Sequence, residues 1–298
     1  MSFAQRLSDH IRRAGSPICV GLDPVIEQIP PAIRASHPDP VDAIRAFTIG
    51  VLDAAQGVAP IVKFQSACYE RYGARGVAAL EEGLAACAPR GVLALLDAKR
   101  GDIGISARHY AAAASGARAD AITLSPYLGP DTLMPYLDAG LGIFVLVRTS
   151  NPDSDVIQSE RLAGGAGGAG GAGGTAGTTV AGHVAAIVRR LGETRRGASG
   201  LSDVGAVVGA TKSADAAELR RLMPDTWFLI PGFGAQGGSA KDIVPMVRPG
   251  SAPETSGVLV TASRSIIYPA GDHSDWRGAI REAALAFHAE IAAVVRPS

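Results

Sequence analysis

The chain has 298 residues, a formal net charge of zero and a pI near 7.0. Hydrophobic residues make up 47% of it and charged residues 19%, proportions that exclude a disordered chain and suit a protein with a large buried core. The balanced charge gives no electrostatic reason to expect nucleic acid or an anionic membrane surface as a partner. We therefore expect a small-molecule ligand.

The start of the chain, residues 1–13, mixes charged and apolar side chains, whereas a signal peptide needs an unbroken apolar stretch. This pattern predicts an amphipathic helix and a cytoplasmic protein. Three cysteines, Cys19, Cys68 and Cys87, lack the spacing of metal ligands. Their odd number and spacing indicate free, buried thiols in a reducing compartment.

Short apolar runs that end in polar or glycine-rich turns recur eight times along the chain. They span residues 17–22, 58–64, 92–96, 119–124, 143–147, 204–208, 227–230 and 258–261. Their Val, Ile and Leu content predicts buried parallel strands, and helical spacing separates several of them, as at 41–55, 74–87 and 179–191. This alternation predicts an α/β fold, a (β/α)8 TIM barrel formed as one domain by residues 1–298. A doubly wound open sheet is the alternative.

A repeated Gly-Gly-Ala tract occupies residues 163–177, with nine glycines in fifteen positions. Such a composition predicts a flexible loop, and its place after the fifth predicted strand makes it an insertion on the barrel rather than a linker between domains. A neutral insertion is the favoured interpretation, and a functional lid is the alternative.

Charged residues follow the predicted strands where a barrel of this kind carries its active site, at the C-terminal ends. Asp23 follows the first run, Lys63 lies near the end of the second, and Asp97, Lys99 and Asp102 follow the third. If the third strand continues, Asp97 and Lys99 point to the same face, because side chains alternate along a strand. A carboxylate keeps a neighbouring ammonium protonated, which makes Lys99 a positioned proton donor. Lys63, Lys99, Asp97 and Asp102 would then form an array of two cations and two anions.

The scarcity of lysine decides between a catalytic array and an ordinary ion pair, which would explain most Asp-x-Lys sequences. Only four of the 28 basic residues are lysines, and two of them, Lys63 and Lys99, fall at adjacent predicted strand ends. A compact, titratable ammonium can serve there where a guanidinium cannot. We therefore interpret the segment as catalytic.

A glycine-rich segment, Pro231–Gly238, follows the seventh run, and Arg264 follows the eighth. Barrels often bind phosphate with the loops after these two strands, and arginine can bind phosphate through two hydrogen bonds. This pairing predicts a phosphate site. Ser125 after the fourth strand could hydrogen-bond a planar substrate, whereas residues 148–152 after the fifth give an ambiguous signal. The sequence contains no metal-ligand spacing and no dinucleotide-binding motif, so neither a metal nor a cofactor is expected.

The segment Leu96–Ile103 resembles the Asp-x-Lys-x-x-Asp signature of the orotidine 5′-phosphate decarboxylases, in particular their longer-chain type 2 branch. Other segments resemble further motifs of that family and lie in the same order, between Asp23 and Tyr268. They are Val20–Pro24, Lys63–Gln65, Ser125–Gly129, Pro231–Gly232 with Gln236, and Ser263–Ser265. Ser263 departs from the glycine that many members carry before the arginine.

The resemblance implies a cofactor-free homodimer that converts orotidine 5′-monophosphate to uridine 5′-monophosphate in de novo pyrimidine biosynthesis. It implies that Lys99 protonates C6, that Asp97 lies near the departing carboxylate, and that Lys63 joins the charge network. Asp102 would reach the site of the partner subunit. The substrate-binding residues that it implies are Asp23, Ile103, Ser125, Pro231, Gln236 and Arg264.

Three other functions remain alternatives. A related decarboxylase could act on a sugar-phosphate β-keto acid with Mg²⁺. A Schiff-base aldolase could use Lys212, which follows the sixth predicted strand. A non-enzymatic barrel could bind nucleotides through Gln236 and Arg264 without any need for Lys99.

Overall fold

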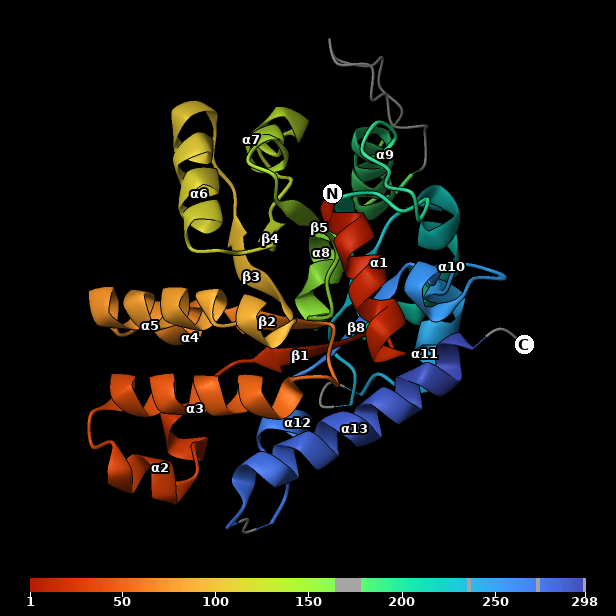
Figure 1. Cartoon of the computed structure of the whole chain (residues 1–298). Helices are drawn as coiled ribbons and strands as arrows, with labels where there is room; N and C mark the ends of the chain where they lie inside the picture. Colours follow the sequence, from red (N-terminus) through yellow and green to blue (C-terminus); the bar gives the residue numbers. More distant parts are fainter. Residues whose placement is uncertain (164–177, 235–236, 272–273, 297–298) are drawn as a thin grey trace.

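The computed structural model describes residues 1–163, 178–234, 237–271 and 274–296. Eight parallel strands form a closed barrel in sequence order, and β8 pairs with β1 (Figure 1). The strands are β1 (Ile18–Leu22), β2 (Ile61–Gln65), β3 (Leu93–Arg100), β4 (Ala121–Leu124), β5 (Gly142–Arg148), β6 (Val204–Val208), β7 (Phe228–Ile230) and β8 (Val258–Ala262). The predicted (β/α)8 barrel is confirmed, and its closure rules out the open sheet. The predicted insertion at 163–177 lies, apart from Ala163, outside the described residues.

Helices run between the strands on the outside of the barrel (Figure 1). The longer ones are α1 (Phe3–Ala14), α3 (Pro40–Ala55), α5 (Gly73–Ala85), α6 (Gly104–Gly116), α9 (Val180–Gly192), α10 (Ser213–Leu222) and α13 (Trp276–Val295). The shorter ones are α2 (Pro31–Ser36), α4 (Ser66–Glu70), α7 (Met134–Asp138), α8 (Asp155–Gln158), α11 (Ala240–Ile243) and α12 (Arg264–Ile267). The helices predicted at 41–55, 74–87 and 179–191 are α3, α5 and α9.

Side-chain alternation along the strands separates two cores. In β2 and β3, Val62, Phe64 and Ala94 pack outward against the helices. Ile61 and Leu95 belong to a separate cluster inside the barrel. The same alternation carries the inward face from Ile61 to Lys63, and from Leu95 to Asp97, at the C-terminal ends of these strands.

Helix α1 closes the opposite, N-terminal end of the barrel. Its residues Phe3, Leu7 and Ile11 are buried in the interior cluster. The Phe3 ring meets the Phe144 ring edge to face, with centroids 6.0 Å apart. Gly142 gives this ring its space, since a Cβ there would lie 2.1 Å from Phe3. The predicted N-terminal amphipathic helix is therefore confirmed, and it leaves the C-terminal end of the barrel for a ligand.

The three cysteines are unpaired, as expected. Cys19 and Cys87 are buried, but Cys68 is partly exposed, so the prediction of burial is wrong for that residue. No helix in the described ranges is long and apolar enough to cross a membrane.

We predict that Leu7→Ala lowers the free energy of unfolding by about 2–5 kcal/mol, because a fully buried leucine leaves a cavity between α1 and the barrel. Urea denaturation followed by circular dichroism measures the change. The matched control is Arg13→Ala on the exposed face of α1, which should change stability by less than about 0.5 kcal/mol. Equal stability of the two variants would show that α1 contributes little to the barrel interior.

Candidate active site

A cavity of about 520 Å³ opens at the C-terminal ends of the strands. Each of the eight strands, or the segment directly after it, contributes residues to it, and apolar residues from the barrel interior form its floor. Its lining consists of Asp23, Lys63, Gln65, Asp97, Lys99, Thr123, Leu146, Thr149, Ser150, Asn151, Gln158, Val207, Leu229, Pro231, Gly232, Phe233, Thr261, Ala262, Ser263 and Arg264.

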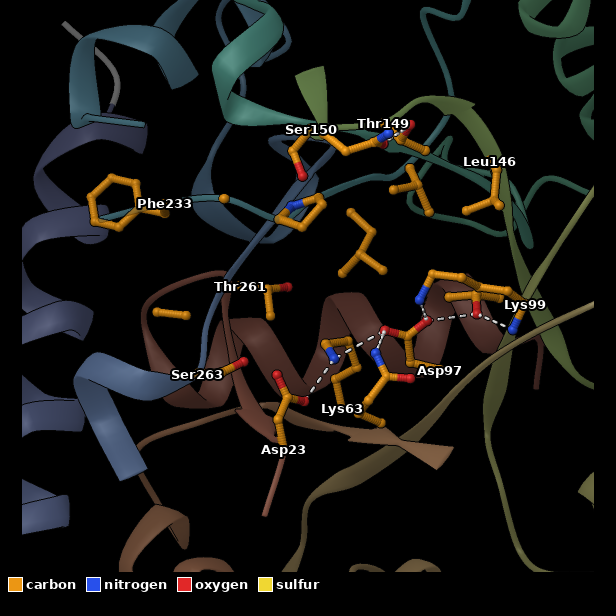
Figure 2. Close-up of a pocket in the computed structure, with 18 of the residues that line it drawn as sticks. Asp23, Lys63, Asp97, Lys99, Leu146, Thr149, Ser150, Phe233, Thr261 and Ser263 are labelled. Carbon is orange, nitrogen blue, oxygen red and sulfur yellow. Dashed lines mark hydrogen bonds and ion pairs between the residues drawn. The ribbon is translucent and has the colours of Figure 1, made fainter. Parts of the chain in front are cut away.

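Four of these side chains form a row of alternating charge, which we call the charge row: Asp23, Lys63, Asp97 and Lys99. The Lys63 Nζ lies 3.2 Å from Asp23 Oδ1 and 3.0 Å from Asp97 Oδ2. The Lys99 Nζ donates to Asp97 Oδ1 at 2.6 Å. Figure 2 shows the row along one side of the cavity. Within this chain, the two predicted lysines and Asp97 lie together, and Asp23 is the second anion beside them.

The centre of the charge row is buried, since Lys63 and Asp97 are each 6% exposed. Burial alone would raise the pKa of Asp97, but the two lysines outweigh it and lower the pKa to about 2. Burial would likewise lower the pKa of Lys63, yet Asp23 and Asp97 raise it above its usual value. Both groups are therefore charged at neutral pH, each stabilised by its neighbours.

The Asp97 carboxylate also accepts hydrogen bonds from two uncharged groups. Thr123 Oγ1 donates to Oδ1 at 2.8 Å, and Gln65 Nε2 donates to Oδ2 at 3.3 Å. Together with the two lysines, these donors hold the carboxylate in one orientation. Thr123 was not predicted, although its place two residues before Ser125, at the end of β4, could have pointed to it.

Lys99 reaches the row through an irregular backbone rather than through simple alternation. Its φ is +46°, in the left-handed region that non-glycine residues rarely adopt. The register of β3 with β4 shifts between Leu96 and Arg100. Lys99 therefore meets Asp97, as predicted, but the assumed regular strand is wrong at this point. A left-handed conformation costs a non-glycine residue about 1–2 kcal/mol.

The far wall of the cavity is the segment 149–158, which we call the wall loop. Thr149, Ser150, Asn151 and Gln158 line the cavity, and Figure 2 shows Thr149 and Ser150 across from the charge row. Residues 148–152 were ambiguous in the sequence and were not assigned to the site, and Gln158 was missed altogether. Loops lack the periodicity that identifies strands, which explains the omission.

Arg148, directly before the wall loop, is buried and holds the loop in place. Its guanidinium binds Asp155 at 2.6 Å and Asp215 at 2.7 Å. Ser154 accepts a further bond at 3.3 Å. Lys212 binds the same Asp155 at 2.8 Å and does not line the cavity. Its place outside the cavity disfavours a Schiff-base role for Lys212, because the nucleophilic amine must reach the substrate.

The end of the cavity near β7 and β8 holds the predicted phosphate-binding residues. Pro231, Gly232 and Arg264 line it, and Arg264 begins the short helix α12. Ser263 lies in the lining close to β1, where a Cβ on Gly21 would come within 1.9 Å of its Oγ. The predicted residue Gln236 lies outside the described part of the chain.

Three predicted site residues do not line this cavity: Asp102, Ile103 and Ser125. Asp102 and Ile103 lie directly before α6, where the Asp102 carboxylate accepts the Ile103 N–H at 2.8 Å. The backbone N–H of Ser125 donates to the Arg100 carbonyl at 2.8 Å. The segments after β3 and β4 therefore lie side by side, outside the cavity.

Within residues 1–163, 178–234, 237–271 and 274–296, no group of three or more His, Cys, Asp or Glu side chains is arranged to hold a metal ion. The donors gathered at the cavity are instead alternating ammonium and carboxylate groups.

The closed barrel and its charge row together define a (β/α)8-barrel enzyme with an ionic active site. The model of the orotidine 5′-phosphate decarboxylase / HUMPS family matches residues 16–169. The chain is 37% identical to an orotidine 5′-phosphate decarboxylase of Rhodopirellula baltica, over 98% of this chain and 99% of that protein. It is 38% identical to one of Deinococcus radiodurans, over 97% of each chain. The chain belongs to the orotidine 5′-phosphate decarboxylase family.

The solved structure of Leishmania donovani OMP decarboxylase has the same architecture. It superposes with a TM-score of 0.74 at 31% identity, over 99% of this chain and 98% of that one. The recognition of the family from the residue motifs is thereby confirmed.

We predict that the stability contributed by Asp97 disappears as the pH falls from about 4 to about 2. The folded pKa of Asp97 is about 2, below the ordinary value of 3.8, so the unfolded chain takes up its proton first on acidification. The difference in unfolding free energy between the wild type and Asp97→Asn should therefore fall by about 2 kcal/mol over this range.

Urea denaturation at a series of pH values measures that difference. Asp131→Asn, which removes an exposed carboxylate outside the cavity, is the control and should show a flatter difference. A difference for Asp97→Asn that does not change with pH would contradict the lowered pKa.

Proposed function

We propose that this chain is a cytoplasmic enzyme of de novo pyrimidine biosynthesis that decarboxylates orotidine 5′-monophosphate to uridine 5′-monophosphate without a metal or organic cofactor. The observation that carries the proposal is the charge row within a barrel of this family. The names of the relatives support the same substrate.

The chemical step breaks the bond between C6 and its carboxylate, and carbon dioxide leaves. The electron pair stays on C6 as a vinylic carbanion, which the ring cannot delocalise. The fixed charges of the row suit this demand, because preorganised charge stabilises a developing anion without reorganisation. Lys99 then donates a proton from Nζ to C6, and Asp97 orients that ammonium while staying ionised.

The rest of the cavity offers groups for the other parts of the nucleotide. Asp23, at one end of the charge row, can accept hydrogen bonds from ribose hydroxyls, and Lys63 lies next to it. Arg264 and Pro231 lie at the end assigned to the phosphate, together with Gln236 by resemblance. Ser150 supplies a hydroxyl inside the lining, which makes it better placed for the pyrimidine than Ser125.

We further propose that residues 1–298 form one domain and that two such barrels form a homodimer, in which Asp102 and Ile103 complete the partner's site. Large apolar side chains are exposed around the start of α6 and after β4. They include Ile103 (62% exposed), Ile105 (63%) and Tyr127 (90%). A contiguous exposed apolar surface favours a protein–protein interface, and these segments lie side by side.

We predict that Lys99→Ala lowers turnover of orotidine 5′-monophosphate by at least about a thousandfold, because it removes both the proton donor and a charge beside the carbanion. The fall in ultraviolet absorbance of the substrate measures turnover. The fold should persist, since the Lys99 side chain is 46% exposed. Lys241→Ala, an exposed lysine outside the cavity, is the control and should keep wild-type activity. A non-enzymatic nucleotide-binding barrel would show no turnover in the wild type.

We expect wild-type turnover to survive dialysis against EDTA, since the row provides charge without a metal. The Mg²⁺-dependent sugar-phosphate decarboxylase predicts the opposite result, with activity lost in EDTA and restored by Mg²⁺. Borohydride reduction in the presence of substrate tests the aldolase: covalent labelling of Lys212 would support it, and we expect none.

Mixing inactive Lys99→Ala and Asp102→Ala proteins should restore activity if Asp102 serves the partner's site. A hybrid dimer then carries one site with both residues intact, so up to about a quarter of wild-type activity is expected from random exchange. Each variant alone, and a mixture of Lys99→Ala with Asp97→Ala, serve as controls. Both of those residues belong to the same site, so the control mixture should stay inactive. Failure of the first mixture to recover activity, despite subunit exchange, would contradict a shared site.

A further inference from the structure

The backbone around Lys99 departs from the regular β-ladder, opposite one residue of β4. Leu96 pairs with Ile122, and the next pair is Arg100 with Leu124. Between these pairs β3 advances by four residues while β4 advances by two. Thr123 therefore faces a bulge that contains Asp97, Ala98 and Lys99, and a bulge leaves backbone groups without ladder partners.

The hydroxyl of Thr123 occupies that gap and makes two hydrogen bonds. The backbone N–H of Lys99 donates to Thr123 Oγ1 at 2.9 Å. Thr123 Oγ1 in turn donates to Asp97 Oδ1 at 2.8 Å, and the same Oδ1 accepts the Lys99 ammonium at 2.6 Å. One hydroxyl thus contacts both the main chain of Lys99 and the carboxylate that orients its side chain. Thr123 is only 1% exposed, so water does not compete for these bonds.

We propose that Thr123 is a positioning residue that fixes Lys99 for proton transfer through these two bonds. The inference rests on the proposed role of Lys99 as the proton donor. A non-glycine residue persists at φ +46° only where its surroundings determine the conformation. The Thr123 hydroxyl holds this conformation by accepting the Lys99 backbone N–H. Through its bond to Asp97, it also fixes the position of the Lys99 Nζ.

The chemistry of threonine suits this position better than an apolar residue of the same shape. A hydroxyl has one proton to donate and two lone pairs to accept, so it can serve both partners at once. Valine would fill the same space in β4 but would leave the Lys99 N–H unpaired and remove one donor from Asp97. A buried polar group without a partner is costly, and the strained backbone of Lys99 would relax toward an ordinary conformation.

Thr123→Val is expected to lower kcat for orotidine 5′-monophosphate by about tenfold to a hundredfold, with KM within about threefold of the wild type. We expect kcat to fall while KM changes little, because the substitution does not alter the wall loop or the β7–β8 end of the cavity. In the proposed function, these parts hold the rest of the substrate. A merely structural role would lower the melting temperature without changing kcat per folded molecule. Wild-type kcat in Thr123→Val would overturn the proposal.

The pair Thr123→Ser and Thr123→Ala isolates the hydroxyl and keeps the test decisive if the valine variant does not fold. Both substitutions remove the methyl group, but only serine retains the two hydrogen bonds. Thr123→Ser should keep kcat within about threefold of the wild type, whereas Thr123→Ala should lose about tenfold or more. Equal kcat in the two variants would overturn the proposal, because the hydroxyl would then contribute nothing.

Thr48→Val is the matched control. Thr48 is also 1% exposed, and its hydroxyl bonds the Tyr69 hydroxyl at 2.9 Å, away from the cavity. This variant should lose stability but retain the wild-type kcat. Turnover by the wild type distinguishes the two proposals. An inactive wild type would overturn the proposed function and this inference together. An active wild type with an equally active Thr123→Ala would overturn this inference alone.

Discussion

The active site depends on the Asp97 carboxylate, which binds two ammonium groups, a hydroxyl and an amide inside the mouth of the barrel. Removing a charge from water is costly, and opposite charges at close range return much of that cost only when the geometry is good. Asp97 meets this condition because each of its oxygens has two donors. The same carboxylate raises the pKa of Lys63 and binds the Lys99 Nζ, so it connects the two lysines of the charge row.

The barrel supplies the rigidity that such an arrangement requires. Lys63, Asp97 and Thr123 project from three adjacent strands, and backbone hydrogen bonds hold those strands in register. Below them, the interior is filled by apolar side chains and closed by α1. The charge row therefore lies at the C-terminal mouth, above an interior filled with apolar side chains. Within this frame, the interactions of the row are stronger than they would be at an exposed surface.

Much of this arrangement could be predicted from the sequence, because buried parallel strands have a distinctive composition and their C-terminal ends share one edge. That reasoning placed Lys63 and Asp97 correctly, while the family motif supplied the roles. It did not identify the bulge at Lys99, because a bulge depends on the register between two strands. It also missed Thr149 and Ser150, which line the cavity beside Arg148, and Arg148 is held in part by Asp215, a residue distant in the sequence. Such contacts follow no local pattern.

The bulge in β3 is what places Lys99 in the charge row. If β3 were regular, Lys99 would lie on the inward face two residues beyond Asp97, and its backbone would hydrogen-bond to β4. The left-handed turn at Lys99 instead brings its ammonium to within 2.6 Å of the Asp97 carboxylate, although the backbone conformation is unfavourable. The barrel tolerates this local cost because its two cores stabilise the fold independently of the site. Strain at the proton donor is thus the expected consequence of fixing a flexible lysine side chain at a single position.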